Sequence, residues 1–236
     1  MEPAIARALT RKGAPARGFT LVEMVVVLAI ISIITLIAVF GQTTFNRSMV
    51  LTDTAYTLAF SIREAQSFGL SSRVFNATQN AGYGLHFVHN IPTSYTLFAD
   101  TLPGASGNTQ DAAQCPGHTT GTVPEAKPGD CRWSSAAETV RTYGFNKGFY
   151  IKSFCGKLAS SPTTERCNGS QMDSLTIVYM RPNTQSIING IQGTARTPLL
   201  DATIRIASPG GASERCVYVS KMGQVSVLQQ GETLCP

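Results

Sequence analysis

The sequence predicts an α+β fold in which one long N-terminal helix packs on an antiparallel, sandwich-like β-sheet head. Three features of the chain support this prediction. Residues 19–40 form a nearly unbroken apolar run, and residues 51–69 repeat small or apolar residues at alternating spacings of four and three. From Gly82 onward, short runs alternate between apolar and polar residues. The first two patterns are typical of helices and the third is typical of β-strands.

The apolar run is long enough to cross a membrane. As a helix, Phe19 to Phe40 would span roughly 33 Å, about one hydrocarbon core. The leader before this run is basic, which predicts a cytoplasmic N-terminus and places everything after Gly41 outside the cytoplasm. Part of the net charge of +5 therefore comes from leader residues that set the membrane orientation, so this charge only weakly supports a nucleic-acid partner. The basic residues of the leader are Arg7, Arg11, Lys12 and Arg17.

The helical pattern continues beyond the apolar run. The chain has no proline between Phe19 and Ile91, so nothing forces the helix to break. We expect one helix from about Phe19 to about Phe68, ending at Gly69, with residues 42–70 as its amphipathic continuation. The face that packs on the head is predicted to consist of Leu51, Ala55, Leu58, Ile62, Ala65 and Gly69.

The rest of the chain, residues 71–236, is predicted to form an extracytoplasmic β-rich head. Two hairpin turns are expected, at Asn146–Gly148 and Lys221–Gly223. The segment from Leu102 to Cys131 is rich in Gly, Pro, Thr and Ala, which indicates a long surface loop. The predicted strands are Tyr83–Val88, Tyr95–Ala99, Thr139–Phe145, Phe149–Phe154, Leu175–Met180, Ala202–Ile206, Cys216–Val219 and Gln224–Leu228.

The six cysteines all follow the apolar run, which indicates disulfides in an oxidising compartment. Their spacing does not fit a zinc site, and buried free thiols are the alternative. Many pairings are open to six cysteines. Sequential pairs are favoured because each would enclose a loop or a hairpin. These pairs are Cys115–Cys131, Cys155–Cys167 and Cys216–Cys235.

Glu23 lies inside the apolar run, where a carboxylate is expensive and therefore needs an explanation. A secretory signal peptide would be cut near Gly41, but the run is too long for one and the helical pattern continues past that point. A plain membrane anchor explains the length but not Glu23. The stretch Arg17–Met24, RGFTLVEM, resembles the prepilin peptidase site of type IV pilins and type II secretion pseudopilins.

This resemblance implies that residues 1–18 are a leader peptide, that prepilin peptidase cuts between Gly18 and Phe19, and that Phe19 becomes N-methylated. Residues 19–41 would be the transmembrane helix and later the filament core. Glu23 would pair with the terminal amine of a neighbouring subunit during assembly. The implied partners are other pilins or pseudopilins and an inner-membrane assembly platform. The implied location is the bacterial inner membrane, and then the pilus or pseudopilus.

Two downstream segments resemble one class within this family, the GspH/FimT class. Ala59–Gln66 is similar to the Ala-Arg-x-Glu-Ala run that closes its long helix. Val217–Val225 is similar to its terminal Val-x-Val-x-x-x-Gly-x-Val hairpin. The chain departs from many pilins in having no proline near Phe40, so local melting of the helix there is not carried over.

The sequence offers no catalytic constellation, so we expect a non-enzymatic protein without a cofactor or metal. His86 and His89 belong to opposite faces of a predicted strand, and His118 lies in a loop without a motif. Four acidic residues around the long loop match no calcium template, and a solvated loop is the simpler interpretation. They are Asp100, Asp111, Glu125 and Asp130.

Residues 140–157 carry four basic side chains, five aromatic rings and no acid. Such a predicted hairpin could track a phosphate backbone and stack on single-stranded bases, although a hairpin with its rings in the core fits the same pattern. We therefore expect a structural minor pilin or pseudopilin. The alternatives are a DNA-uptake receptor and a plain membrane-anchored domain. The candidate DNA contacts are Arg141, Lys147, Lys152 and Lys157.

Overall fold

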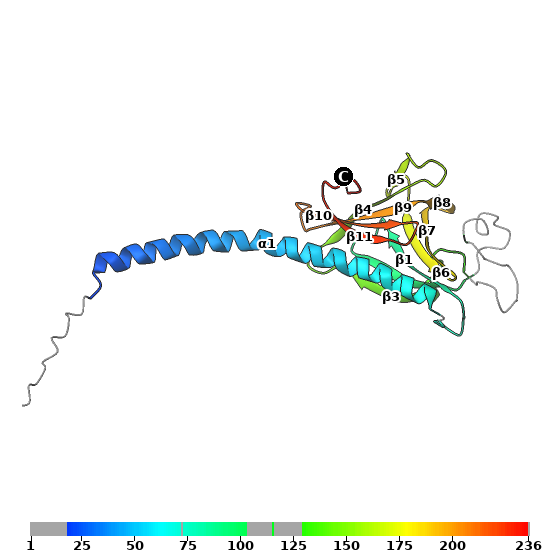
Figure 1. Ribbon diagram of the computed structural model, residues 1–236, viewed down its shortest axis with the longest axis horizontal. Helices are drawn as coiled ribbons and strands as arrows, with labels where there is room; N and C mark the ends of the chain where they lie inside the picture. Colours follow the sequence, from blue (N-terminus) through cyan, green and yellow to red (C-terminus); the bar gives the residue numbers. More distant parts are fainter. Residues whose placement is uncertain (1–17, 72, 103–114, 116–128, 236) are drawn as a thin grey trace, which may run out of the picture. The chain divides into compact units, whose positions relative to one another are not determined.

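The computed structural model describes residues 18–71, 73–102, 115 and 129–235, except for the side chains of residues 40–45 (Figure 1). The chain forms two compact units, one up to Phe45 and one from Asn46. Most of the predicted leader and most of the loop between Leu102 and Cys131 lie outside the described residues, including Asp111, His118 and Glu125.

One helix, α1 (Leu21–Leu70), contributes to both units, and its bounds lie within two residues of the prediction. In the second unit its predicted packing face is buried, with Leu51, Ala55, Leu58, Ile62 and Ala65 fully inaccessible to solvent. Gly69 is also buried, and a Cβ at that position would lie 2.2 Å from the Tyr179 carbonyl oxygen. The glycine therefore allows the last turn of the helix to approach the sheet closely.

The head is built from two antiparallel sheets that enclose one principal core (Figure 1). The six-stranded sheet has the order β3-β2-β1-β6-β7-β8, and the five-stranded sheet has the order β11-β10-β9-β4-β5. The strands are β1 (Gly82–Val88), β2 (Ser94–Asp100), β3 (Thr139–Gly144), β4 (Tyr150–Lys157), β5 (Glu165–Cys167), β6 (Ser174–Met180), β7 (Asn183–Gln192), β8 (Ala195–Leu199), β9 (Asp201–Ala207), β10 (Glu214–Ser220) and β11 (Val225–Gln229).

The α+β prediction is confirmed, and each of the eight predicted strands matches a strand of the structure. The core joins the inner face of α1 to side chains from both sheets. Phe87 and Ile177 enter it from the six-stranded sheet, and Phe154 and Ile204 enter it from the five-stranded sheet. Three strands, β5, β7 and β8, were not predicted. A short 3-10 helix, η1 (Ala136–Glu138), precedes β3.

The hairpin predicted at Lys221–Gly223 is confirmed, because β10 and β11 pair directly across this turn. The hairpin predicted over residues 140–157 is wrong. β3 pairs with β2 in one sheet, whereas β4 pairs with β5 and β9 in the other. Lys147 and Gly148 do form a tight turn, with φ values of 57° and 76°. This turn connects β3 in one sheet to β4 in the other. Turn residues alone therefore did not reveal which strands pair.

The structure contains the three sequential disulfides, Cys115–Cys131, Cys155–Cys167 and Cys216–Cys235. Cys155 and Cys167 lie directly opposite one another on β4 and β5, so this bond fixes a strand of three residues. The bond from Cys216 attaches the C-terminal segment to β10. Each bond restricts the unfolded chain and so favours the folded head.

Candidate functional site

The residues around the predicted cleavage point are exposed and lie just before α1. Gly18, Phe19 and Thr20 are outside the helix, and Phe19 is 76% exposed. A Cβ added to Gly18 would have no atom within 4 Å, so the fold itself does not require glycine there. A requirement for glycine at this position would therefore come from a second molecule that grips the chain closely.

Glu23 sits in the first turn of α1, where a capping interaction fixes the local backbone. Its N–H donates to the Thr20 hydroxyl oxygen at 3.2 Å, so Thr20 caps the N-terminus of the helix. The sequence Thr20-Leu-Val-Glu23 has the spacing of a capping box, and a carboxylate here is favoured by the helix dipole. The Glu23 side chain itself is exposed. It is therefore available to a cationic group brought by another chain.

The segment after Glu23 has the length and composition of a membrane span. Leu21–Val39 contains 19 residues, about 28 Å of helix, and its large apolar side chains are between 44% and 80% exposed. Its two hydroxyl side chains donate to carbonyl oxygens one turn back: Ser32 to Leu28 at 2.7 Å and Thr35 to Ile31 at 2.8 Å. These bonds lower the cost of placing the hydroxyls in an apolar environment.

The acidic residues near the long loop form a buried anchor for its ends. Asp100 accepts from the N–H groups of Asp130 and Cys131 at 2.9 and 2.8 Å. Glu138, which the sequence analysis did not single out, accepts from the N–H groups of Thr101 and Leu102 at 2.9 and 2.8 Å. Because the carboxylates accept backbone N–H groups at both ends of the loop, their arrangement serves to hold that loop.

Burial changes the acidity of this anchor. It raises the pKa of Asp100 well above the usual value, and the neighbouring Asp130 raises it further. Burial also raises the pKa of Asp130 to about 6, although the Arg196 guanidinium 3.6 Å away opposes this shift. Asp100 lies within reach of the sulfurs of Cys115 and Cys131. Those two atoms are joined in a disulfide, so they are not available as thiolate ligands.

The described histidines make separate contacts. His86 is buried and stacks on Trp133, with ring centroids 4.9 Å apart. Burial lowers the pKa of His86 to about 4, and the Arg132 charge acts in the same direction. His89 is exposed and bonds to the Asn168 side chain at 2.7 Å. The structure does not bring these two histidines together in one site.

The basic residues of the 140–157 segment are distributed among different contacts. Lys152 forms an ion pair with the buried Glu214, and Lys157 lies 3.9 Å from the Asp201 carboxylate. The Arg141 guanidinium lies 5.7 Å from the centre of the Tyr143 ring. Lys147 is exposed at the turn between the sheets. The segment contains no acidic residue, but Asp201 on β9 and Glu214 on β10 lie beside two of its lysines.

The rings of the same segment mainly pack within the head. Phe149 and Phe154 are buried in the principal core. Tyr143 stacks on Tyr95 at 5.1 Å and donates its hydroxyl to Glu64 at 2.6 Å. These contacts match the alternative in which the aromatic residues stabilise the head.

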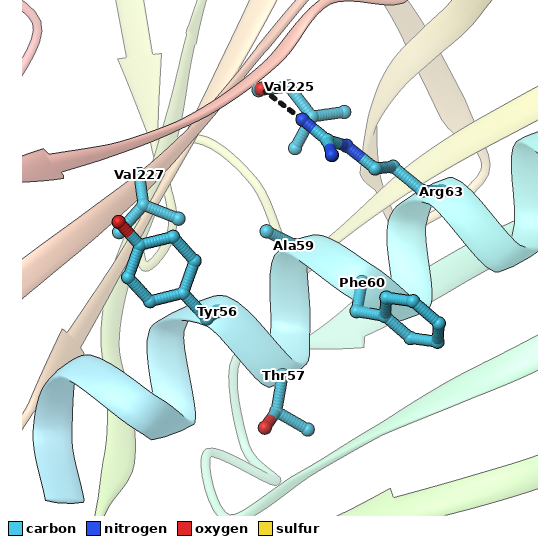
Figure 2. Close-up of a pocket in the computed structure, with 7 residues that line it drawn as sticks. All are labelled: Tyr56, Thr57, Ala59, Phe60, Arg63, Val225 and Val227. Atoms are coloured by element: carbon cyan, nitrogen blue, oxygen red, sulfur yellow. Dashed lines mark hydrogen bonds between the residues drawn. The ribbon is translucent and has the colours of Figure 1, made fainter.

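A groove of about 400 Å³ runs between α1 and the edge strand β11, and sequence reasoning missed it (Figure 2). Tyr56 and Phe60 project from the helix and are 60% and 72% exposed. Arg63 reaches across the groove and donates to the Val225 carbonyl oxygen at 3.4 Å. The remaining lining residues are Thr57, Ala59 and Val227. The groove joins two segments far apart in the chain, so no local pattern reveals it.

Comparison with protein families matches residues 14–39 to the prokaryotic N-terminal methylation motif. Comparisons with curated proteins and with solved structures gave no significant match. The matched range contains Gly18, Phe19, Thr20 and Glu23 together with the apolar span Leu21–Val39. This match supports a type IV pilin-like precursor that is anchored by its N-terminal helix and processed by prepilin peptidase.

Proposed function

We propose that this protein is a minor pilin or pseudopilin, a non-enzymatic subunit of a type IV pilus or type II secretion pseudopilus. The observation that carries the proposal is the methylation motif, in which Gly18 and Glu23 flank the start of an exposed apolar helix. Such a helix needs either lipid or other apolar helices around it. A subunit that moves from membrane to filament core meets both requirements.

Glu23 gives this assembly its register. Cleavage before Phe19 creates a terminal amine at the start of the apolar helix. In an assembled bundle, a neighbouring subunit's amine can neutralise the Glu23 carboxylate. A shifted arrangement would leave both charges unpaired in apolar surroundings, which is strongly unfavourable. The charge pair therefore selects one axial offset between neighbours.

Processing tests the first part of the proposal. We expect the mature chain to begin with methylated Phe19, and we expect Gly18→Ala to slow or abolish cleavage. N-terminal mass spectrometry of the membrane-bound and filament-bound chain measures both. Because Gly18 has open space around it, the substitution leaves the fold intact. A mature chain that begins near Gln42 would instead identify a signal peptide, and an unprocessed chain would identify a plain anchor.

Assembly tests the second part. We expect Glu23→Val to leave membrane insertion and cleavage intact but to reduce incorporation into filaments. Ser32→Val is the matched control, because it removes a polar side chain that already bonds within its own helix. Immunoblots of sheared filaments and of membranes compare the two variants. Normal incorporation of Glu23→Val would show that this carboxylate does not set the register.

The type of machine is the finer part of the proposal. Ala59–Gln66 and the β10–β11 hairpin resemble the GspH/FimT class, in which minor subunits join or initiate a filament. We infer that the partners are other pilin-like subunits and an inner-membrane assembly platform. Affinity capture of the full chain from cross-linked membranes, followed by mass spectrometry, identifies whether pilus or secretion components accompany it.

A further inference from the structure

One of the three disulfides is open to solvent, whereas the other two are sealed inside the head. Cys155 and Cys167 are partly exposed. Cys155 follows Phe154, which enters the principal core, so the cysteine side chain leaves the opposite face of the five-stranded sheet. The cysteines of the other two bonds are inaccessible to solvent; they are Cys115, Cys131, Cys216 and Cys235.

The exposed disulfide lines a pocket of about 410 Å³. Two cations, Lys152 and Arg205, belong to the same wall, and both form ion pairs with the buried Glu214. The pocket is large enough to admit a side chain of another protein next to the two sulfurs. Its other lining residues are His89, Ser153, Glu165, Asn168 and Thr203.

Hydrogen bonds hold one wall of this pocket in place. The Asn168 side-chain oxygen accepts from the Phe154 N–H at 3.0 Å, and its amide nitrogen donates to His89 Nδ1 at 2.7 Å. The Asn168 N–H donates in turn to the Phe154 carbonyl oxygen at 2.9 Å. Access to the exposed disulfide is therefore part of the folded head and does not depend on local unfolding.

The two sealed bonds lack such access. Cys131 packs in a small apolar cluster with Phe98 and Met180. Cys235 lies in a turn in which its N–H donates to the Glu232 carbonyl oxygen at 2.7 Å, and the preceding carbonyl accepts from Thr203 at 3.5 Å. A reagent can reach the sulfurs of these bonds only when that part of the head opens.

We propose that Cys155–Cys167 is a thiol-exchange site at which an external protein dithiol acts on the folded head. A thiolate of the dithiol attacks one sulfur, the Cys155–Cys167 bond breaks, and the other cysteine leaves as a thiolate that takes a proton from water. The second thiol of the partner then attacks the mixed disulfide. This step releases the reduced cysteine pair and leaves the partner oxidised, so two electrons pass to the head. The reverse sequence restores the bond.

The location of the bond suits reversible chemistry. β5 is an edge strand of three residues, and the disulfide is its covalent link to β4. Opening the bond removes this link and leaves the principal core untouched, because neither cysteine belongs to that core. The head can therefore remain folded in both redox states.

Glu165 gives the site a measurable electrostatic signature. Its carboxylate lies within 4.8 Å of both sulfurs. A negative charge at this distance repels an incoming thiolate and disfavours the departing one. Glu165→Gln should therefore accelerate exchange, by roughly three- to tenfold. A purely structural disulfide that opens only on unfolding would not respond in this way.

Timed thiol trapping tests the proposal on the oxidised full chain in uncharged detergent micelles. Reduced thioredoxin serves as the protein dithiol, N-ethylmaleimide stops the reaction, and peptide mass spectrometry measures the label on each cysteine. We expect Cys155 and Cys167 to be labelled roughly tenfold faster than the other four cysteines. In the same chain unfolded in guanidinium, the three pairs should react at comparable rates, because access then no longer differs.

The charge variant is measured in the same assay. Asp53→Asn is the matched control, because it also removes one exposed negative charge but lies on α1. It should leave the rate at Cys155 and Cys167 unchanged, and thermal unfolding checks that both variants remain folded.

Three results would overturn the inference: equal or faster labelling of a sealed pair in the folded chain, resistance of all three bonds to the protein dithiol, and equal rates for Glu165→Gln and the wild type. These measurements involve neither processing nor filament assembly. Their failure would therefore leave the function proposed above unaffected.

Discussion

At the scale of single residues, Gly69 determines how closely the end of α1 can approach the six-stranded sheet. Its absent side chain leaves room for the Tyr179 carbonyl oxygen, which would lie 2.2 Å from a Cβ. Backbone cannot move aside as a flexible side chain can. Gly69 is also the last residue of the repeat that faces the head in the sequence. The same residue therefore ends the helical repeat and allows the close approach to Tyr179.

We therefore predict that Gly69→Ala destabilises the head by about 1–3 kcal/mol, because overpacking forces the helix and the sheet apart. Gly144→Ala is the matched control. Gly144 also lacks a side chain, but a Cβ there meets no atom within 4 Å. Urea unfolding of the head, residues 46–236, measures both changes. Equal stability of the two variants would show that the end of α1 can move away from the sheet without loss of folding free energy.

Glu214 is a second residue on which several contacts depend. Its side chain is 3% exposed and lies 3.4 Å from Arg205, with Lys152 forming the other ion pair. We predict that Lys152→Glu destabilises the head by about 1–3 kcal/mol, because it places a second carboxylate beside a buried one. Lys147→Glu, at the exposed turn, should change stability by less than about 0.5 kcal/mol.

Thermal and urea unfolding of the two lysine variants distinguishes a structural role from a surface role. A large loss for Lys152→Glu alone would assign this lysine to the fold. Equal and small effects for both variants would contradict the ion pair with Glu214 as a stabilising contact. The comparison also bears on the DNA-binding alternative, since a lysine required for the fold is a poor reporter of phosphate contacts.

At the scale of elements, alternation of apolar and polar residues predicted eight strands, and the three missed strands lack that pattern for identifiable reasons. β7 begins with Asn183-Thr-Gln-Ser, which is polar on both faces. β8 contains Pro198, which an edge strand tolerates. β5 has only three residues and depends on pairing with β4 and on its disulfide. Each of these strands is determined by its neighbours rather than by its own sequence.

The wrong hairpin over residues 140–157 has the same origin. Its turn residues were recognised correctly, but strand pairing depends on distant segments. The N–H groups of Phe145 and Ile151 donate to the carbonyl oxygens of Thr93 and Pro92 at 2.8 and 2.7 Å. Both sides of the turn are thus tied to the connection between β1 and β2. These contacts lie about fifty residues away in the chain and follow no local signal.

The position of Phe149 leads to a prediction at this scale. It lies immediately before β4, is 3% exposed and belongs to the principal core. We predict that Phe149→Ala destabilises the head by about 3–5 kcal/mol through lost burial and a cavity. Phe60→Ala is the matched control, because the same side chain on the exposed face of α1 is 72% exposed. Urea unfolding should show little change for this control.

If Phe149→Ala were as stable as Phe60→Ala, the ring would not be a core element, and its availability to a ligand would need to be reconsidered.

At the scale of the whole molecule, the two sites differ in how far a sequence can predict them. The residues of the N-terminal site, Gly18, Thr20 and Glu23, are close together in the sequence and lie within one turn of the start of α1. Its motif can therefore be recognised from the sequence alone. The acidic anchor draws on β2, η1, β8 and the residues next to Cys131. The groove beside Tyr56 joins α1 to β11. Such sites exist only after the chain has folded.

Two parts of the head respond to pH in opposite directions. The raised pKa values of Asp100 and Asp130 mean that the folded head holds these protons more tightly than the unfolded chain. Their contribution to stability is fully present below the unfolded pKa near 3.8, and the Asp130 part is lost as pH rises through about 6. The lowered pKa of His86 has the opposite effect on stability, because the folded head binds this proton less tightly than the unfolded chain. Its contribution is present above pH 6.5 and is lost as pH falls towards about 4.

We therefore predict that His86→Phe changes the slope of stability against pH. The phenylalanine can retain the stack on Trp133 but takes up no proton. Between neutral pH and pH 4.5, the free energy of unfolding of the wild type should fall by about 2–3 kcal/mol more than that of the variant. The reason is that His86 takes up a proton mainly in the unfolded wild type over this range. The exposed His89 provides the matched control, His89→Phe. Urea unfolding across this pH range gives the slopes directly, and because each variant is compared with itself, any constant cost of the substitution cancels. Parallel slopes for wild type and His86→Phe would mean that His86 is protonated equally in the folded and unfolded chain, and would contradict the lowered pKa of this buried residue of β1.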